Sequence, residues 1–128
     1  MKEKLLQLLN NSYSPYSHFR VACIVQTKDG KEYKGVNIEN ASYGATMCAE
    51  RVAIFSAVAD GHKPHDFEKM FVMCDSDKIG PSCFACRQVI SEMFEGDKEI
   101  VFMANTGEYV SHKVKEICPY PFTSENME

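Results

Sequence analysis

One segment decides the fold expected of this chain: TMCAERVAIFSAVADG, residues 46–61. Thr46 is a suitable N-cap and Gly61 a suitable stop, so the segment predicts a helix over residues 46–59. The apolar residues that recur on one helical face are Ala53, Ile54, Ala57 and Val58. A second segment, CFACRQVISEMF at residues 83–94, repeats Val89, Ile90, Met93 and Phe94 at the same helical spacing. Two helices therefore dominate the middle of the chain.

Short apolar and β-branched runs flank these helices. Residues 19–26 and 32–37 are expected to form two strands joined by the Asp29-Gly30 turn. Further strands are expected at residues 70–74, 100–104 and 108–111, and short helices at residues 4–9 and 114–117. The order α-β-β-α-β-α-β-β-α predicts an α/β sandwich with the strands in the middle. With no repeat, low-complexity tract or linker, residues 1–128 are interpreted as one domain.

Composition and charge narrow the class of protein. The chain has 128 residues, 45% of them apolar, which fills one core without disulfides. No apolar run has the length of a membrane span, and no secretion signal is recognisable, so we expect a soluble, cytoplasmic protein without a membrane partner. A formal charge of -4 and a pI near 5.6 argue against a nucleic-acid partner and favour small substrates.

Six cysteines in a reducing compartment indicate metal binding or catalysis rather than disulfides. Cys83 and Cys86 form a Cys-x-x-Cys pair at the start of the second helix, where the helix dipole favours thiolates. Cys48 lies in the first turn of the other helix. Three sulfur ligands without a fourth at motif spacing are typical of a catalytic zinc site with an open coordination position. The remaining cysteines, Cys23, Cys74 and Cys118, are interpreted as small buried apolar residues.

Cys-x-x-Cys alone also fits a redox pair, or a closed structural site completed by Cys74 or a histidine. Glu50 favours catalysis, because a carboxylate two residues beyond a metal-binding cysteine can act as the proton shuttle for a metal-activated water. Residues i and i+2 diverge by about 200° on a regular helix. Cys48 and Glu50 can therefore face one pocket only if Cys48 precedes the first helical turn.

Cys48-x-Glu50 followed by Cys83-x-x-Cys86 occurs in the order of the signature of zinc nucleobase deaminases, in which H-x-E or C-x-E is followed by P-C-x-x-C. The chain most resembles the small homotetrameric cytidine deaminases. The runs that carry the resemblance are residues 13–19, 37–43, 48–51, 83–88 and 119–122, so it covers nearly the whole chain. It implies a three-layer α-β-α sandwich around a five-stranded mixed sheet. It also implies hydrolysis of the 4-amino group of free cytidine or deoxycytidine, as in pyrimidine salvage.

Carried over by resemblance, the zinc ligands are Cys48, Cys83 and Cys86, one Zn²⁺ per chain. Glu50 is then the general acid and base: it takes a proton from the zinc-activated water that attacks C4, and returns protons to N3 and the departing amine. Arg51, beside this motif, is expected to bond to a ligand thiolate and offset the charge of three sulfurs.

The same resemblance assigns residues to the nucleoside. Asn37 and Glu39 are expected to bind the ribose, and Phe19 to pack against the pyrimidine. Tyr43 and Phe122 are expected to reach the site of a neighbouring subunit. The alternative for Phe122 is that it folds back onto its own core.

The chain departs from the family beside the second ligand, where the proline is displaced to Pro81 and Phe84 stands where glycine is common. Three other functions share some of its features. A nucleic-acid editing deaminase needs a basic groove, which this acidic chain lacks. A blasticidin-type deaminase has a similar size and metal motif, but the Asn37-x-Glu39 pair favours a nucleoside. In a non-catalytic zinc scaffold, Glu50 would be an ordinary helix residue.

Overall fold

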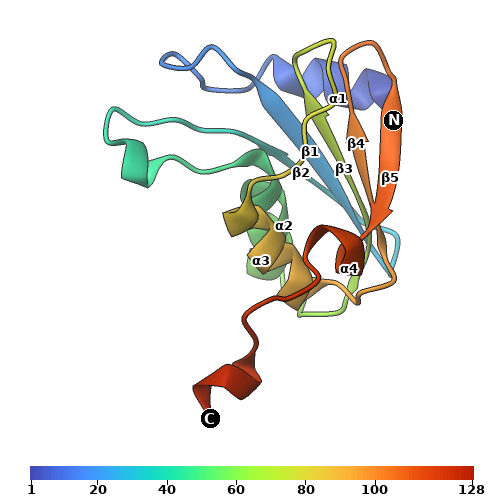
Figure 1. Cartoon of the computed structure of the whole chain (residues 1–128). Coiled ribbons are helices and arrows are strands. Elements are labelled where there is room, and N and C mark those ends of the chain that lie inside the picture. The colour runs from blue at the N-terminus through green and yellow to red at the C-terminus, as the bar shows by residue number, and fades with distance from the viewer.

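A five-stranded mixed sheet forms the middle layer of the computed structural model, which describes residues 1–128 (Figure 1). The strands are β1 (Val21–Thr27), β2 (Glu32–Val36), β3 (Phe67–Cys74), β4 (Glu99–Met103) and β5 (Tyr109–Lys113). Their order in the sheet is β2-β1-β3-β4-β5. Only β3 and β4 pair in parallel; the other neighbours are antiparallel. The expected α/β sandwich is confirmed, with the expected order of strands and helices.

Helices cover both faces of the sheet (Figure 1). On one face α1 (Lys2–Leu9) buries Leu5 and Leu9 in a cluster of seven core residues. On the other face α2 (Ala49–Ala59) and α3 (Phe84–Met93) pack over a larger cluster of 15 buried residues. The short α4 (Val114–Ile117) closes the edge of this second cluster. Alternating residues of the central strands thus enter two separate cores, which is why those strands are apolar on both faces.

The start of α2 lies directly on β2 because Gly35 has no side chain. A Cβ atom built on Gly35 would be 2.2 Å from the carbonyl oxygen of Ala49 and 2.5 Å from the backbone nitrogen of Ala53. Any larger residue would push the first turn of α2 off the sheet. Gly35 therefore fixes where the N-terminal end of this helix lies.

The structure corrects two of the details expected from the sequence. Thr46 is not the N-cap of α2: Cys48 is, because Met47 pairs with Ile38 in an isolated bridge that keeps this part of the chain extended. Thr46 instead ends the 3-10 turn Tyr43–Ala45. Cys118, expected to be buried, is only partly so, since it follows α4 where the chain leaves the core.

Residues 118–128, which we call the C-terminal tail, extend away from the sandwich (Figure 1). The tail ends in a 3-10 turn, Ser124–Met127, and none of its residues is buried. None of the helices in the structure combines the length and the apolar character that crossing a membrane requires.

Candidate metal centre

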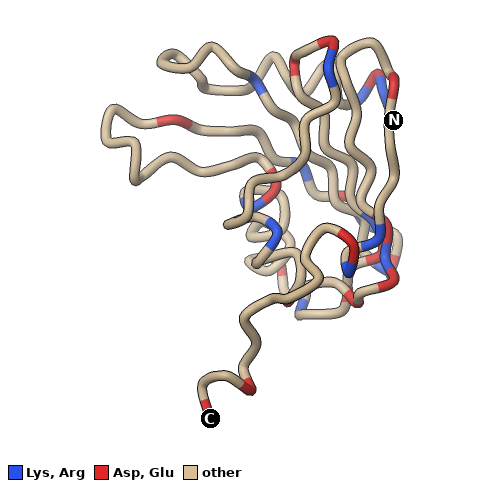
Figure 2. Tube along the Cα trace, in the orientation of Figure 1, with Lys and Arg blue, Asp and Glu red and all other residues tan.

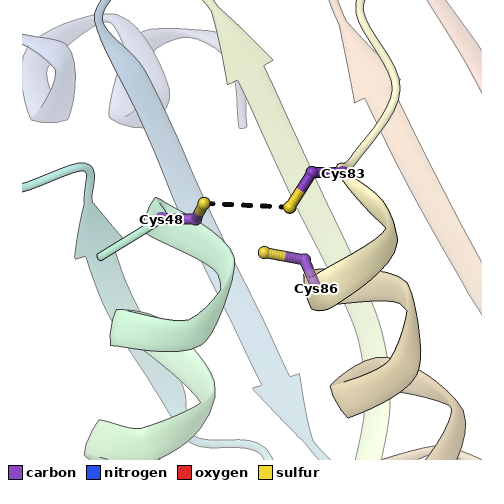
Figure 3. Close-up of side chains that lie close together, drawn as sticks. All are labelled: Cys48, Cys83 and Cys86. Carbon is purple, nitrogen blue, oxygen red and sulfur yellow. Dashed lines mark hydrogen bonds between the residues drawn. The ribbon is translucent and has the colours of Figure 1, made fainter. Parts of the chain in front are cut away.

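Three cysteine thiols from two helices meet at the ends of α2 and α3 (Figure 3). Cys48 and Cys83 are the N-caps of the two helices, with extended backbones at φ −73°, ψ 151° and φ −67°, ψ 164°. Cys86 lies in the first turn of α3 and is fully buried. The three sulfur atoms lie within 4.8 Å of one another, and those of Cys48 and Cys83 are 3.9 Å apart. The fold thus brings together the three residues that the sequence singled out.

This sulfur cluster fits zinc. Tetrahedral Zn²⁺ with bonds of about 2.3 Å separates its sulfur ligands by about 3.8 Å, close to the observed spacing. The cluster contains no fourth histidine, cysteine or carboxylate within the same distance. A zinc ion held here would keep one coordination position open, which distinguishes catalytic from structural sites.

The electrostatics of the cluster favour anionic sulfur at Cys48. Hydrogen bonding with the Cys86 thiol and with Arg51 lowers the pKa of Cys48 to about 5. The Arg51 guanidinium donates through Nη2 to Cys48 Sγ at 3.4 Å, and this contact raises the pKa of Arg51. The hydrogen bond with Cys48, together with burial, raises the pKa of Cys86. A divalent cation between the sulfurs would relieve this competition and let all three bind as thiolates.

Glu50 lies in the first turn of α2 with only 5% of its surface exposed. Burial raises the pKa of its carboxyl group, while a hydrogen bond with Ser82 opposes the rise. Because Cys48 has an extended rather than a helical backbone, Cys48 and Glu50 line the same cavity. The geometric condition set by their two-residue spacing is therefore met.

The cavity has a volume of about 270 Å³ and lies between the sulfur cluster and the loop before β1. Most of its lining is apolar, with a few polar groups, as in pockets for small molecules. The residues expected at the site that line it are Phe19, Asn37, Glu39, Cys48, Glu50 and Cys83. Cys74, interpreted from the sequence as a small buried apolar residue, also lines the cavity, and its pKa is raised to about 11 by burial and by Glu50. The one available signal was its place at the end of β3, before the loop to Cys83.

Asn37 and Glu39 hold the loop that carries Phe19. The amide of Asn37 donates through Nδ2 to the carbonyl of Phe19 at 2.7 Å and accepts the backbone N–H of Val21 at 2.9 Å. One carboxylate oxygen of Glu39 accepts the backbone N–H groups of Tyr16 and Ser17, and the other accepts the Ser17 hydroxyl. Both side chains are therefore fixed at the mouth of the cavity. Their expected contact with a ribose stays a prediction.

Tyr43 and Phe122 lie outside this cavity. Tyr43 is 69% exposed on the 3-10 turn and packs edge-to-face against Tyr16, with ring centroids 5.9 Å apart. Phe122 is 59% exposed on the C-terminal tail and does not fold back into the core. Charged residues are sparse on the loops over residues 10–19 and 37–47 and on most of the tail (Figure 2).

Comparisons with known proteins agree with this geometry. Residues 1–104 match the family described as "Cytidine and deoxycytidylate deaminase zinc-binding region". The chain is 38% identical to a cytidine deaminase of Halalkalibacterium halodurans over 98% of its length and 93% of the relative, and 37% identical to one of Sporosarcina psychrophila over 91% and 84%. Its structure is similar to that of cytidine deaminase from Burkholderia pseudomallei, with a TM-score of 0.89, 37% identity and 94% of each chain covered.

Proposed function

Since the chain belongs to the cytidine and deoxycytidylate deaminase family, we propose that it hydrolyses the 4-amino group of free cytidine and deoxycytidine. The products are uridine or deoxyuridine and ammonia. One observation supports the proposal beyond family membership. The three thiols form one cluster, and two of them, Cys48 and Cys83, line the same cavity as Glu50.

Zinc held by Cys48, Cys83 and Cys86 would supply a water molecule that is more acidic, and more nucleophilic at neutral pH, than water in solution. Glu50 does the proton transfer. Its carboxylate takes one proton from the water and passes it to N3 as the oxygen adds to C4 of the ring. It then takes the second proton from the added hydroxyl group and passes it to the amine as the C4–N bond breaks, which leaves a carbonyl at C4 and ammonia. The raised pKa of Glu50 suits this role, because the group must hold a proton between the two halves of the reaction.

The residues around the cavity have supporting roles in this proposal. Arg51 stabilises the Cys48 thiolate through the hydrogen bond at 3.4 Å, which tempers the charge that three sulfurs place on zinc. Phe19 packs against the pyrimidine ring, and Asn37 and Glu39 bind the ribose. Their bonds to the Phe19 loop support a linked arrangement, in which the same two side chains hold the loop and face the sugar.

The site is completed by a second copy of the chain. We place Phe122 in a neighbouring subunit's pocket within a homotetramer, with Tyr43 at the same junction. Two features support this. The ring of Phe122 is exposed on an uncharged stretch of the tail, and Pro119 and Pro121 limit the conformations lost when the tail docks.

One assay separates this function from its competitors. The zinc-loaded protein is incubated with cytidine, deoxycytidine and blasticidin S, and loss of the cytosine absorbance band is followed. We expect turnover of both nucleosides and none of blasticidin S. Turnover of blasticidin S alone would assign the chain to the other deaminase class, and no turnover of any substrate at full zinc occupancy would make the protein a zinc-binding scaffold.

A further inference from the structure

A single side chain holds the C-terminal tail at Phe122. The amide of Gln88, on α3, donates through Nε2 to the carbonyl oxygen of Phe122 at 2.7 Å. The backbone N–H of Phe122 donates to Gln88 Oε1 at 3.1 Å. One side-chain amide therefore satisfies both backbone polar groups of Phe122, as a neighbouring strand would do. These two bonds join residues 34 positions apart in the chain.

The tail has a second attachment to the same helix. Arg87, next to Gln88, donates through Nη1 to the carbonyl of Ile117 at 3.2 Å, just before the tail begins. Two aromatic side chains of the tail are turned outward: Tyr120 is 99% exposed and Phe122 is 59% exposed. Because no tail residue is buried, packing of its own side chains contributes little to its direction. The backbone of Phe122 is held and its ring is left free.

We propose that Gln88 is a positioning residue for the neighbouring subunit's active site: its amide fixes Phe122 in the direction from which the ring enters that site. The inference rests on the proposed function and on the shared site. Gln88 lies two residues beyond Cys86, yet it serves the pocket of another chain rather than the metal of its own.

We call the two hydrogen bonds between the Gln88 amide and the backbone of Phe122 the Gln88 clamp. Three variants measure its contribution to activity. Gln88→Ala removes both hydrogen bonds and is expected to lower kcat/KM for cytidine about tenfold, mainly through KM, since a mobile tail must be ordered on docking. Gln88→Glu keeps the acceptor for the Phe122 N–H but loses the donor, so its loss should be intermediate. The matched control is Gln26→Ala, which removes a glutamine amide bonded at 3.1 Å to Glu32 on the β1–β2 hairpin and should leave kcat/KM unchanged.

Subunit mixing then shows whether Gln88 acts on the active site of its own chain or on that of a neighbouring chain. If Gln88 positions the donated Phe122, Gln88→Ala mixed with inactive Glu50→Gln regains activity above the sum of the two parents. Some mixed sites then combine an intact Glu50 with a properly held tail. Gln88→Ala mixed with Phe122→Ala should show no gain, because both variants damage the same donated element. Zinc content and assembled mass of Gln88→Ala are expected to equal those of the wild type.

Several results would overturn the proposal. Wild-type kcat/KM in Gln88→Ala, loss of its zinc, loss of its assembly, or complementation of Phe122→Ala instead of Glu50→Gln would each place the residue in another role. If Phe122→Ala itself fails to complement Glu50→Gln, the site is not shared and the inference falls with it. Failure of the proposed function is distinct from all of these, because then the zinc-loaded wild type does not deaminate cytidine.

Discussion

Each end of α2 carries a cluster of titratable side chains, and the two clusters differ in how fully their polar groups are hydrogen-bonded. At the C-terminal end, the Tyr33 hydroxyl donates to Asp60 and lies 3.2 Å from His62 Nδ1. The other ring nitrogen of His62 lies 3.2 Å from both carboxylate oxygens of Asp29. At the N-terminal end stand Cys48, Glu50 and Arg51, with the cysteines of α3 opposite.

The two clusters differ in how many of their polar side-chain groups are left without a hydrogen-bond partner. In the cluster of Tyr33, Asp60, His62 and Asp29, which we call the hairpin latch, each side chain bonds to another member, so the cluster ties α2 to the β1–β2 hairpin. At the metal centre, Arg51 Nε is buried without a partner, and three thiols lie close together beside a cavity. Titratable residues alone therefore do not mark a functional site. Unused bonding capacity that faces a cavity does.

Among substitutions at the two ends of α2, removal of a zinc ligand should have the largest effect on activity and stability. We expect Cys83→Ala or Cys86→Ala to lose zinc, activity and much of the stability together, because a site formed only in the folded chain contributes its binding energy to folding. Metal analysis and thermal unfolding measure this. Cys23→Ala and Cys118→Ala, outside the sulfur cluster, should keep full metal content. Equal zinc loss in all four variants would mean that the ligands are wrongly assigned.

Changing the proton shuttle should separate activity from metal binding. Glu50→Gln keeps the shape of the side chain but cannot carry protons, so turnover of cytidine should fall by about 10² to 10⁴. Zinc content should stay at about one per chain, since Glu50 is not a ligand. Steady-state kinetics with metal analysis on the same sample measures both quantities. Near-normal turnover would exclude Glu50 as the acid and base.

At the C-terminal end of α2, removal of one polar group from the hairpin latch should lower stability without lowering activity. Tyr33→Phe removes the hydroxyl that joins Asp60 to His62, and we expect a thermal midpoint lower by a few degrees. Its kcat/KM for cytidine should be within about twofold of the wild type, because the latch lies at the far end of an 11-residue helix. A large loss of activity in this folded, zinc-loaded variant would break the distinction between the two ends.

The smallest effect expected is a shift in an alkaline titration. The hydrogen bond to Asp60 raises the pKa of Tyr33 from 10.0 to about 12. A group whose pKa is raised by folding stabilises the fold fully below its unfolded pKa, and that contribution disappears as the pH rises through the folded value. The stability difference between wild type and Tyr33→Phe should therefore be constant from neutral pH to about pH 10 and vanish by about pH 12. Ionisation of Tyr33 near pH 10, seen in ultraviolet difference spectra of the two proteins, would show that the latch is not formed.

Local sequence signals predicted the fold because each element has its own periodicity and stop. The expected order of elements and the start of α3 at Cys83 agree with the structure. Thr46 was wrong as a helix cap, since the pairing of Met47 with Ile38 is a tertiary contact that no local pattern reports. The hairpin latch escaped prediction for the same reason: Tyr33 and His62 are 29 residues apart.

The site was predictable to the extent that motif spacing determines it. Cys48, Glu50, Cys83 and Cys86 stand at the starts of two helices, so short segments fix their relative positions once the helices pack. Cys74 lines the cavity only because the end of β3 lies below it, which depends on the register of the sheet. The Gln88 clamp joins a helix to the tail 34 residues later and has no local signature.

Cytidine deamination is expected to take place at zinc held between the N-terminal ends of α2 and α3. Its most direct test strips the wild-type protein of metal, restores zinc in steps, and measures zinc per chain and cytidine turnover on each sample. We expect no turnover without metal and a linear rise in turnover that ends at about one zinc per chain. Turnover by the metal-free protein, or a fully loaded protein that leaves cytidine unchanged, would contradict it.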